Sequence, residues 1–478
     1  MTTPRADPDP AGSGGRLTVA MYVYNDATMD SRVRREAATL AAAGHAVTVL
    51  ATNRPGVAEL ERERVEGFEI VRIPVPDRWH RHWLAIRRPG VGRGEALAAA
   101  GRAVARGPAA WPTALRNAGA AAGWLAVSLV RRIALLVPPR LGGPGEWPPA
   151  QAYYLAKWRW STLPWGDAAV AAAPPADVHH GHDLTALPAA VRGARRDGGQ
   201  VVYDSHEIFV ESGRNAERPR WAKALLRRLE RRWGDRLAAL VAVNPEQGRE
   251  IARRVRAARV VTVHNCPPTW RARGDGRLRA MVGAPDGVPL ILYHGAFSPL
   301  RGLEELAEAL LRPALATAHL AYLGFGGHRA ALDAIATDAR FGGRVHVLDA
   351  VPPDELLAMI AGADLDVMPL QRSTLNHWLA SPNKLFESIA AGVPVVVSDF
   401  PVMRRIVLDD PSGPLGAVCD PADPASIAAA IASLLASPAE SRERMRERCR
   451  TAALERWNWE TESRALLDLY ADLSPPRA

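Results

Sequence analysis

Two series of alternating strand-like and helix-like segments limit what this chain can fold into. In the first series, apolar strand runs at residues 17–23 and 46–51 flank a helix-periodic segment at 32–43. The pattern resumes at residue 177 and alternates up to residue 243, with an arginine-rich amphipathic helix predicted at 218–236. Because parallel strands need a crossover connection, usually a helix, this order predicts a parallel sheet with helices on both faces.

The second series begins at residue 290 and repeats the pattern as far as residue 397. Residues 271–289 lie between the two series, and their Gly, Pro and charged side chains predict a linker. The economical architecture is two Rossmann-like, doubly wound α/β domains that face each other across a cleft. Ligands of such sheets bind beyond the carboxyl ends of the strands, so the loops after the strands should carry the chemistry.

The overall charge and the cysteines narrow the class of protein. The chain has 478 residues with 60 Lys and Arg against 51 Asp and Glu, a formal charge of +9 that favours an anionic partner. Cys266, Cys419 and Cys449 are too scattered for a disulfide framework or a zinc site, which indicates a cytoplasmic setting. Residues 1–15 lack an apolar run, so we expect a disordered tail and no signal peptide. The sequence has no window of about 18 uninterrupted apolar residues, so a membrane-spanning helix is not expected.

Residues 79–165 form a basic, tryptophan-rich insertion in the first series. They hold twelve Lys or Arg against two acids, and eight of the fourteen tryptophans. Tryptophan favours the headgroup zone of a bilayer and arginine meets anionic lipid there, so we expect peripheral contact with the inner face of the cell membrane. Two alternatives remain: a helical insertion whose Trp and Arg pack on the core, and nucleic-acid binding. The second is disfavoured, because the segment interrupts an enzyme-like series and resembles no nucleic-acid-binding module.

A loop directly after the strand at 290–293 has the character of an anion site. Gly295 allows a backbone to approach a ligand closely, and Arg301 places a permanent cation at a helix start. The amino end of a helix already favours anions, so a cation there is best explained by an anion bound between them. The alternative is a surface turn with an incidental arginine.

A second loop at residues 381–387 strengthens the anion interpretation. Ser381 is expected to cap a helix whose first residue is Pro382, with Lys384 in its first turn. Glu387 follows three residues later on the same face. A cation for phosphate and a carboxylate for paired sugar hydroxyls together indicate a nucleotide-diphosphate site, although a surface ion pair would also place Lys384 near Glu387.

These segments resemble the donor half of the retaining glycosyltransferases of family 4, which have the GT-B fold. The resemblance extends over nearly the whole chain, and the segments that carry it are residues 293–302, 323–326 and 382–396 in the second half, 30–33, 180–183 and 203–207 in the first half, and 457–460 near the end. It implies an acceptor domain at 16–270, a donor domain at 290–455, and a last helix at 456–478 that returns to the first domain.

The resemblance also implies roles for individual residues. His182 would face the transferred sugar, and Asp204, His206 and Glu207 would line the acceptor side. The donor would contact Gly295, Arg301, Gly324, Ser381, Asn383, Lys384 and Glu387. Arg301 and Lys384 would stabilise the leaving diphosphate, so no essential metal and no cofactor besides the donor substrate are expected.

Two departures from the family pattern affect the donor sugar. Leu379 stands where the family often has a second glutamate, and Ala296 stands where many relatives have an arginine. Sugar contacts would then come from Asn376 or backbone amides. The implied activity is transfer of a sugar from a nucleotide-diphosphate sugar to a polysaccharide, lipid-linked or other cell-surface acceptor of a bacterium. A sugar-nucleotide 2-epimerase and a non-catalytic membrane-associated scaffold with the same fold remain alternatives.

Overall fold

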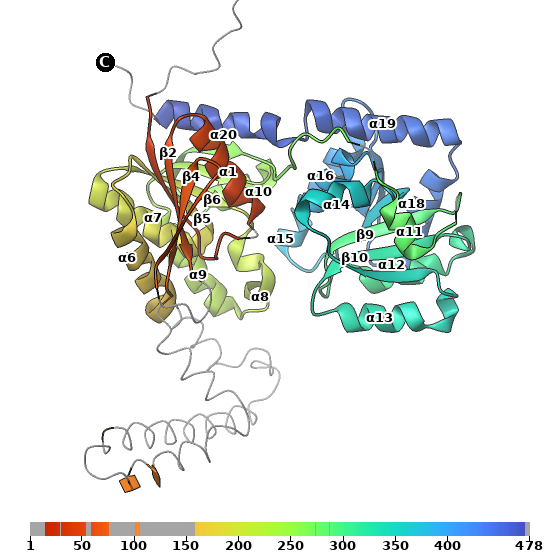
Figure 1. Ribbon diagram of the computed structural model, residues 1–478, viewed down its shortest axis with the longest axis horizontal. Coiled ribbons are helices and arrows are strands. Elements are labelled where there is room, and N and C mark those ends of the chain that lie inside the picture. The colour runs from red at the N-terminus through yellow and green to blue at the C-terminus, as the bar shows by residue number, and fades with distance from the viewer. Residues whose placement is uncertain are drawn as a thin grey trace, which may run out of the picture.

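The computed structural model describes residues 15–28, 30–53, 59–75, 158–272, 274–285 and 287–473, with a few helical positions between 101 and 112. Within these ranges the chain forms two α/β domains side by side (Figure 1). The tail predicted at 1–15, apart from Gly15, and most of the basic insertion lie outside the described residues. None of the described helices is long and apolar enough to cross a bilayer.

The amino-terminal domain is built on an eight-stranded sheet with the order β3-β4-β2-β1-β5-β6-β7-β8. All neighbours pair in parallel except the hairpin of β3 and β4. The strands are β1 Thr18–Tyr22, β2 Ala46–Thr52, β3 Glu61–Val65, β4 Phe68–Ile73, β5 Val178–His182, β6 Gln200–Ser205, β7 Leu237–Ala242 and β8 Ala257–Thr262. The helices are α1 Ser31–Ala42, η4 Trp158–Thr162, α6 Leu163–Ala172, α7 Asp183–Asp197, η5 Phe209–Glu211, α8 Gly213–Ala216, α9 Arg220–Trp233 and α10 Pro245–Ala252.

The carboxy-terminal domain has a six-stranded, all-parallel sheet with the order β11-β10-β9-β12-β13-β14. Its strands are β9 Leu290–Ala296, β10 His319–Phe325, β11 Val345–Asp349, β12 Leu365–Met368, β13 Val395–Ser398 and β14 Gly416–Cys419. Its helices are α11 Arg277–Val282, α12 Leu303–Leu310, η6 Pro313–Leu315, α13 Arg329–Thr337, η7 Ala339–Phe341, α14 Pro353–Ile360, α15 Leu375–Trp378, α16 Asn383–Ala390, α17 Pro401–Leu408 and α18 Pro424–Leu435.

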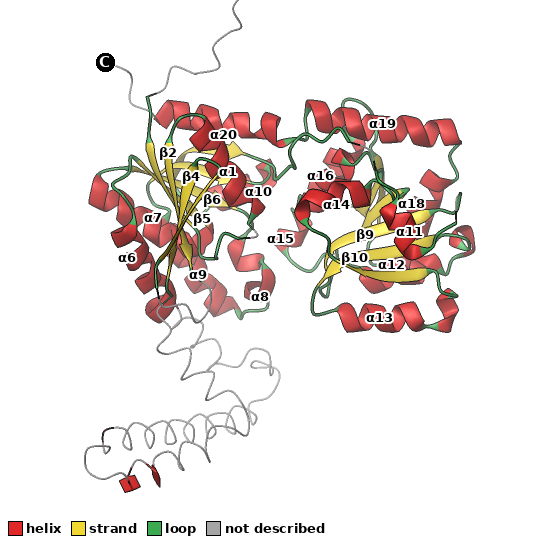
Figure 2. Cartoon of the chain, viewed as in Figure 1, coloured by secondary structure: helices red, strands yellow, loops and turns green. Residues whose placement is uncertain are grey.

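Helices cover both faces of each sheet, as Figure 2 shows. In the amino-terminal domain, one apolar cluster joins the sheet to α6, α7 and α9, and a second joins it to α1 and α20. Near-continuous apolar strands such as β7 are what burial on both faces requires. The predicted doubly wound α/β fold is therefore confirmed.

Two long helices end the described chain and connect the domains. α19 (Ala439–Glu455) packs on helix α16 of the carboxy-terminal domain, and α20 (Trp459–Leu473) crosses to the first domain along the same edge of the molecule (Figure 1). There the indole Nε1 of Trp459 donates to Thr39 Oγ1 at 2.8 Å, and the ring of Tyr470 is fully buried. The chain thus passes between the domains twice.

The segment predicted as a linker is only partly a free connector. Residues 277–282 form α11, whose Leu278 and Val282 are buried in the core of the second domain. The Gly, Pro and charged residues of 271–289 belong mostly to the turns on either side of this helix. They outnumber the few apolar residues of the helix, so the sequence pattern predicted a linker.

The described end of the tryptophan-rich insertion packs into the protein. Trp165 is fully buried and its Nε1 donates to the carbonyl of Ala51 at 3.4 Å. Trp158 is nearly buried and meets Phe209 edge to face. For these two tryptophans the core-packing alternative holds, whereas residues 79–157 lie outside the described helices and strands apart from a few positions.

Candidate active site in the interdomain cleft

The strand order of each sheet reverses at one point, and the predicted site residues lie at both points. In the first sheet the reversal falls between β1 and β5, and in the second between β9 and β12. Loops diverge at such a switch point and leave a crevice at the carboxyl ends of the strands. His182 is the last residue of β5, and Gly295 is the penultimate residue of β9.

Glycines at the carboxyl end of the second sheet permit a close approach of backbone. Gly295 has a φ of 110°, which favours glycine, and the nearest atom to an added Cβ would be Lys384 Nζ at 3.9 Å. Gly324 stands beside it on β10, and a Cβ there would lie 1.9 Å from the carbonyl oxygen of Gly295. Gly324 therefore shapes the loop, while Gly295 leaves open space next to a cation.

Lys384 lies in the first turn of α16, although this helix starts slightly later than the sequence predicts. Asn383 is its first residue and Pro382 its cap, while Ser381 Oγ donates to the carbonyl of Val243 and accepts from Asn244. The Nζ of Lys384 lies 3.5 Å from the centre of the Tyr293 ring, a cation–π contact. Burial lowers the pKa of Lys384 to about 7, with Arg301 contributing.

His294 orients Glu387 and was given no role by the sequence. Its Nδ1 lies 2.7 Å from Asp366 Oδ2 and its Nε2 lies 3.0 Å from Glu387 Oε2. Burial alone would lower the pKa of His294, but the two carboxylates raise it to about 9. Ser388 Oγ in turn donates to Asp366 at 2.5 Å. The position of His294 directly before Gly295 could have drawn attention to it. Its partners Asp366 and Glu387, however, are far away in the sequence.

Arg301 is presented by a tight turn between β9 and α12. Leu300 and Gly302 on either side have φ values of 65° and 71°, and a Cβ on Gly302 would lie 2.0 Å from the carbonyl of Pro369. The Nε of Arg301 donates to Ser298 Oγ at 3.3 Å. Burial and the nearby Asp183 raise the pKa of Glu207 in the other domain, and the charge of Arg301 opposes this shift.

Asp204 is the centre of a buried charge network in the first domain. Arg32 donates to both of its carboxylate oxygens at 2.9 Å, and the imidazoles of His182 and His206 lie 3.2 and 2.9 Å from Oδ2. Burial would raise the pKa of Asp204, but Arg32 and His206 hold it well below its usual range. Burial would lower that of His206, but Asp183 and Asp204 raise it to about 10. Asp204 is thus a fixed anion that positions both histidines.

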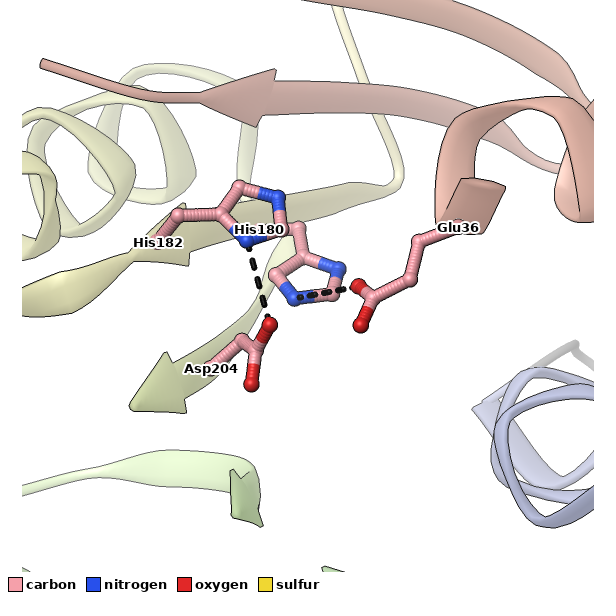
Figure 3. A group of neighbouring side chains, drawn as sticks. All are labelled: Glu36, His180, His182 and Asp204. Atoms are coloured by element: carbon pink, nitrogen blue, oxygen red, sulfur yellow. Dashed lines mark hydrogen bonds and ion pairs between the residues drawn. The ribbon is translucent and has the colours of Figure 1, made fainter. Parts of the chain in front are cut away.

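A second layer of side chains lies behind this network (Figure 3). The ligand-type atoms of Glu36, His180, His182 and Asp204 all lie within 4.8 Å of one another, which is a spacing compatible with a metal ion. The guanidinium of Arg32 lies 3.0 Å from Glu36 and 2.9 Å from Asp204, however, and already pairs with both carboxylates. Burial and the charge of Asp204 raise the pKa of Glu36. The group is therefore a charge-paired support for His182.

A cavity of about 460 Å³ opens between the domains above these residues. It brings together some of the predicted residues from the two halves of the chain, His206 from the first and Asn383 from the second. Its other lining residues are Asn25, Asp26, Asp30, Ser31, Arg32, Val243 and Asn265. Asp204 and His182 lie below its floor, fully or almost fully buried.

Leu379 and Asn376 take part in the contact between the domains. The carbonyl of Leu379 accepts from Asn244 at 2.9 Å, and its side chain packs against the apolar core of the first domain. Asn376 Oδ1 accepts from the backbone N–H of Ile208 at 2.9 Å. The position where the family often has a glutamate therefore serves domain packing in this chain.

Comparison with known proteins decides the family. A profile described as glycosyl transferases group 1 matches residues 276–452, and a profile described as a glycosyl transferase 4-like domain matches residues 129–266. The two halves of the chain therefore each match a glycosyltransferase family, group 1 in the second half and the 4-like domain in the first. The predicted resemblance to family 4 is confirmed, and the group 1 match covers Arg301, Lys384 and Glu387.

Two curated relatives resemble parts of this glycosyltransferase. A D-inositol 3-phosphate glycosyltransferase of Xylanimonas cellulosilytica is 29% identical over 50% of this chain and 58% of its own length. A GDP-mannose-dependent α-(1-6)-phosphatidylinositol monomannoside mannosyltransferase of Mycolicibacterium smegmatis is 30% identical over 40% of this chain and 50% of its own. The chain thus spans little more than half the length of these relatives.

Solved structures share the fold of this glycosyltransferase over nearly its whole length. Sucrose-phosphate synthase from Thermosynechococcus elongatus superposes with a TM-score of 0.66, covering 96% of this chain and 99% of that one, at 16% identity. The similarity confirms the GT-B arrangement of the two sheets.

Proposed function

We propose that this protein is a retaining glycosyltransferase that moves a sugar from a nucleotide-diphosphate sugar to a polysaccharide, lipid-linked or other cell-surface acceptor. One observation carries the proposal: two cations, Arg301 and Lys384, and the oriented carboxylate of Glu387 stand together at the switch point of the donor sheet. Two cations suit a diphosphate, and a carboxylate held by His294 suits the paired hydroxyls of a ribose. The match to the group 1 family supports this assignment.

In this proposal the cleft stabilises the leaving group by fixed positive charge. As the bond between the sugar and the diphosphate breaks, negative charge grows on the phosphate oxygens. Arg301 and Lys384 would meet this charge in a partly dehydrated site, where preorganised cations act far more strongly than in water. They would take the part that a divalent cation takes in other transferases.

The histidines of the first domain would act on the sugar. Nδ1 of His182 is held by Asp204, and within the described part of the chain its Nε2 has no hydrogen-bond partner. That nitrogen is buried below the cavity floor, so a hydroxyl of the transferred sugar would reach it only when the floor residues move aside. His206 lines the cavity and Glu207 follows it in the chain, so these two would border the acceptor.

The acceptor is proposed to reside at the inner face of the bacterial cell membrane. The mannosyltransferase relative is named for the lipid phosphatidylinositol monomannoside. In addition, residues 79–157 of this chain are rich in both arginine and tryptophan. Both support a lipid-linked or membrane-proximal acceptor.

Nucleotide binding tests the donor assignment directly. Thermal-shift titrations with UDP, GDP, ADP and TDP in EDTA should raise the melting temperature with at least one of them, because a ligand of the native state stabilises it. Lys384→Ala and Glu387→Ala should each lower the affinity for that nucleotide by roughly tenfold or more, since a hydrogen bond to a charged group contributes about 1.5–3 kcal/mol.

Arg340→Ala is the matched control for a lost charge. Arg340 is an exposed cation of the same domain, in η7 before β11, and it pairs with Asp338 and Glu308 away from the cleft. Its removal should leave nucleotide affinity unchanged. Wild-type affinity in both site variants would refute the donor site.

A further inference from the structure

Helix α9 is anchored to the first domain by one face only. Ala222 and Leu226 are fully buried in the core below it. Glu230, also buried, accepts from the hydroxyl of Tyr203 at 3.1 Å and pairs with Arg254 at 3.0 Å. These contacts fix the rotation of the helix and determine which side chains point outward.

The outward face exposes two large apolar side chains one turn apart. Trp221 is 53% exposed and Leu225 is 39% exposed. Residues at i and i+4 of a helix are neighbours on its surface, so the two side chains form one patch with the exposed Ala224 between them. A single exposed apolar residue is ordinary, whereas an apolar patch bordered by polar groups indicates a contact surface.

Positive charge around this patch exceeds the nearby negative charge, although Glu217 is exposed in the turn before the helix. The exposed arginines of the helix and of the turn after it are Arg220, Arg228, Arg231, Arg232 and Arg236. Within the described residues none of these five has an ion-pair partner, and the nearby Asp235 pairs with Arg256. An anionic surface would complement this face.

The patch lies beside the predicted acceptor side of the cleft. α9 follows β6, whose carboxyl end leads into His206 and Glu207, so its first turn stands at the same edge of the sheet. Glu211 fixes this placement, because it pairs with Lys223 at 3.0 Å and with Arg227 at 2.7 Å. η5, which follows β6, contacts both α8 and α9.

We propose that the outward face of α9, formed by Trp221, Leu225 and the surrounding arginines, docks on an anionic lipid bilayer. Trp221 and Leu225 would enter the boundary between headgroups and acyl chains while the arginines contact anionic headgroups. The acceptor edge of the cleft then faces the bilayer, where a lipid-linked acceptor can reach it. The inference rests on the membrane-bound acceptor of the proposed function and adds a surface separate from residues 79–157.

Vesicle co-sedimentation of the full chain tests the proposal. Wild-type protein should bind phosphatidylglycerol-containing vesicles and bind pure phosphatidylcholine vesicles much more weakly. The double variant Trp221→Ala with Leu225→Ala should lower the partition coefficient by at least tenfold. Val260→Ala with Met281→Ala removes two apolar side chains that are 49% and 54% exposed elsewhere, and this control should bind like wild type.

The outcomes separate this proposal from the proposed function. Equal binding by the double variant and wild type would overturn docking through α9 while leaving membrane association in place. Absence of wild-type binding to anionic vesicles, or an equal loss in the control, would also overturn it. Nucleotide-induced thermal shifts are measured on the same samples and do not depend on vesicle binding. They show whether each variant is folded and whether it binds a nucleotide, so a wrong donor assignment would appear there and not in the vesicle assay.

Discussion

Lys384 is the residue whose ionisation bears most directly on donor binding. Burial against the Tyr293 ring gives it a pKa of about 7 in the free protein, and a bound diphosphate stabilises its protonated form. Affinity for a nucleotide sugar should therefore fall as the pH rises through this pKa. From about pH 6 to about pH 8 we expect the dissociation constant to rise about tenfold, measured by calorimetry.

The variant Lys384→Arg is the control for this prediction. A guanidinium stays charged at these pH values, so the variant's affinity should vary much less with pH. His294 and His206, with pKa values of about 9 and about 10, remain protonated over the same window and add little to the slope. A flat wild-type profile would contradict the prediction.

The sequence singled out some residues of the candidate site and missed others for a physical reason. Arg301 and Lys384 stood out because a cation at a helix start is locally unfavourable unless an anion compensates. His294 and Arg32 carry no such local signal. Arg32 acquires its role by clasping Asp204, which is 172 residues away, and His294 acquires its role from Asp366 and Glu387. Contacts over such separations exist only in the folded chain.

At the scale of elements, the packing of β9 against β10 fixes the start of the loop that carries Arg301. A methyl group on Gly324 would lie 1.9 Å from the carbonyl of Gly295, so Gly324→Ala must push the strands apart. We expect a loss of stability of about 1–3 kcal/mol or more and weaker nucleotide binding. Chemical denaturation and nucleotide titration measure the two effects.

Gly327→Ala provides a matched control only three residues away. A Cβ on Gly327 would meet nothing within 4 Å. This variant should keep wild-type stability within about 0.5 kcal/mol. If both alanine variants behaved alike, the close approach of the two strands would not be what requires glycine at position 324.

The buried elements followed from the sequence more readily than the edges of the sheets. Runs such as β7 and β9 are apolar because helices cover both faces. β3, β4, β8 and β14 were not predicted. β3 and β8 are edge strands whose side chains are largely exposed, the charged Glu69 and Arg72 interrupt the apolar residues of β4, and β14 has only four residues. These segments are strands because they pair with neighbouring strands, and the sequence alone does not show this pairing.

At the scale of the whole molecule, a set of polar contacts holds the two domains together over the cleft. Asn244 and Gln247 of the first domain donate to the carbonyl of Leu379 at 2.9 and 3.3 Å. Arg405 of the second domain pairs with Glu246 beside them. Together with the return of α20, these contacts keep the residues of the two switch points facing each other.

Leu379→Glu tests whether position 379 helps to hold the two domains together. A carboxylate there would face the apolar core of the first domain, at a cost of about 1–3 kcal/mol, and should favour separation of the domains. We expect a larger radius of gyration by small-angle X-ray scattering and a lower transfer rate, whereas Leu379→Met should scatter like wild type. If the glutamate instead left the radius unchanged and raised the transfer rate, position 379 would contact the donor sugar as it does in the family, and its role in closure would be refuted.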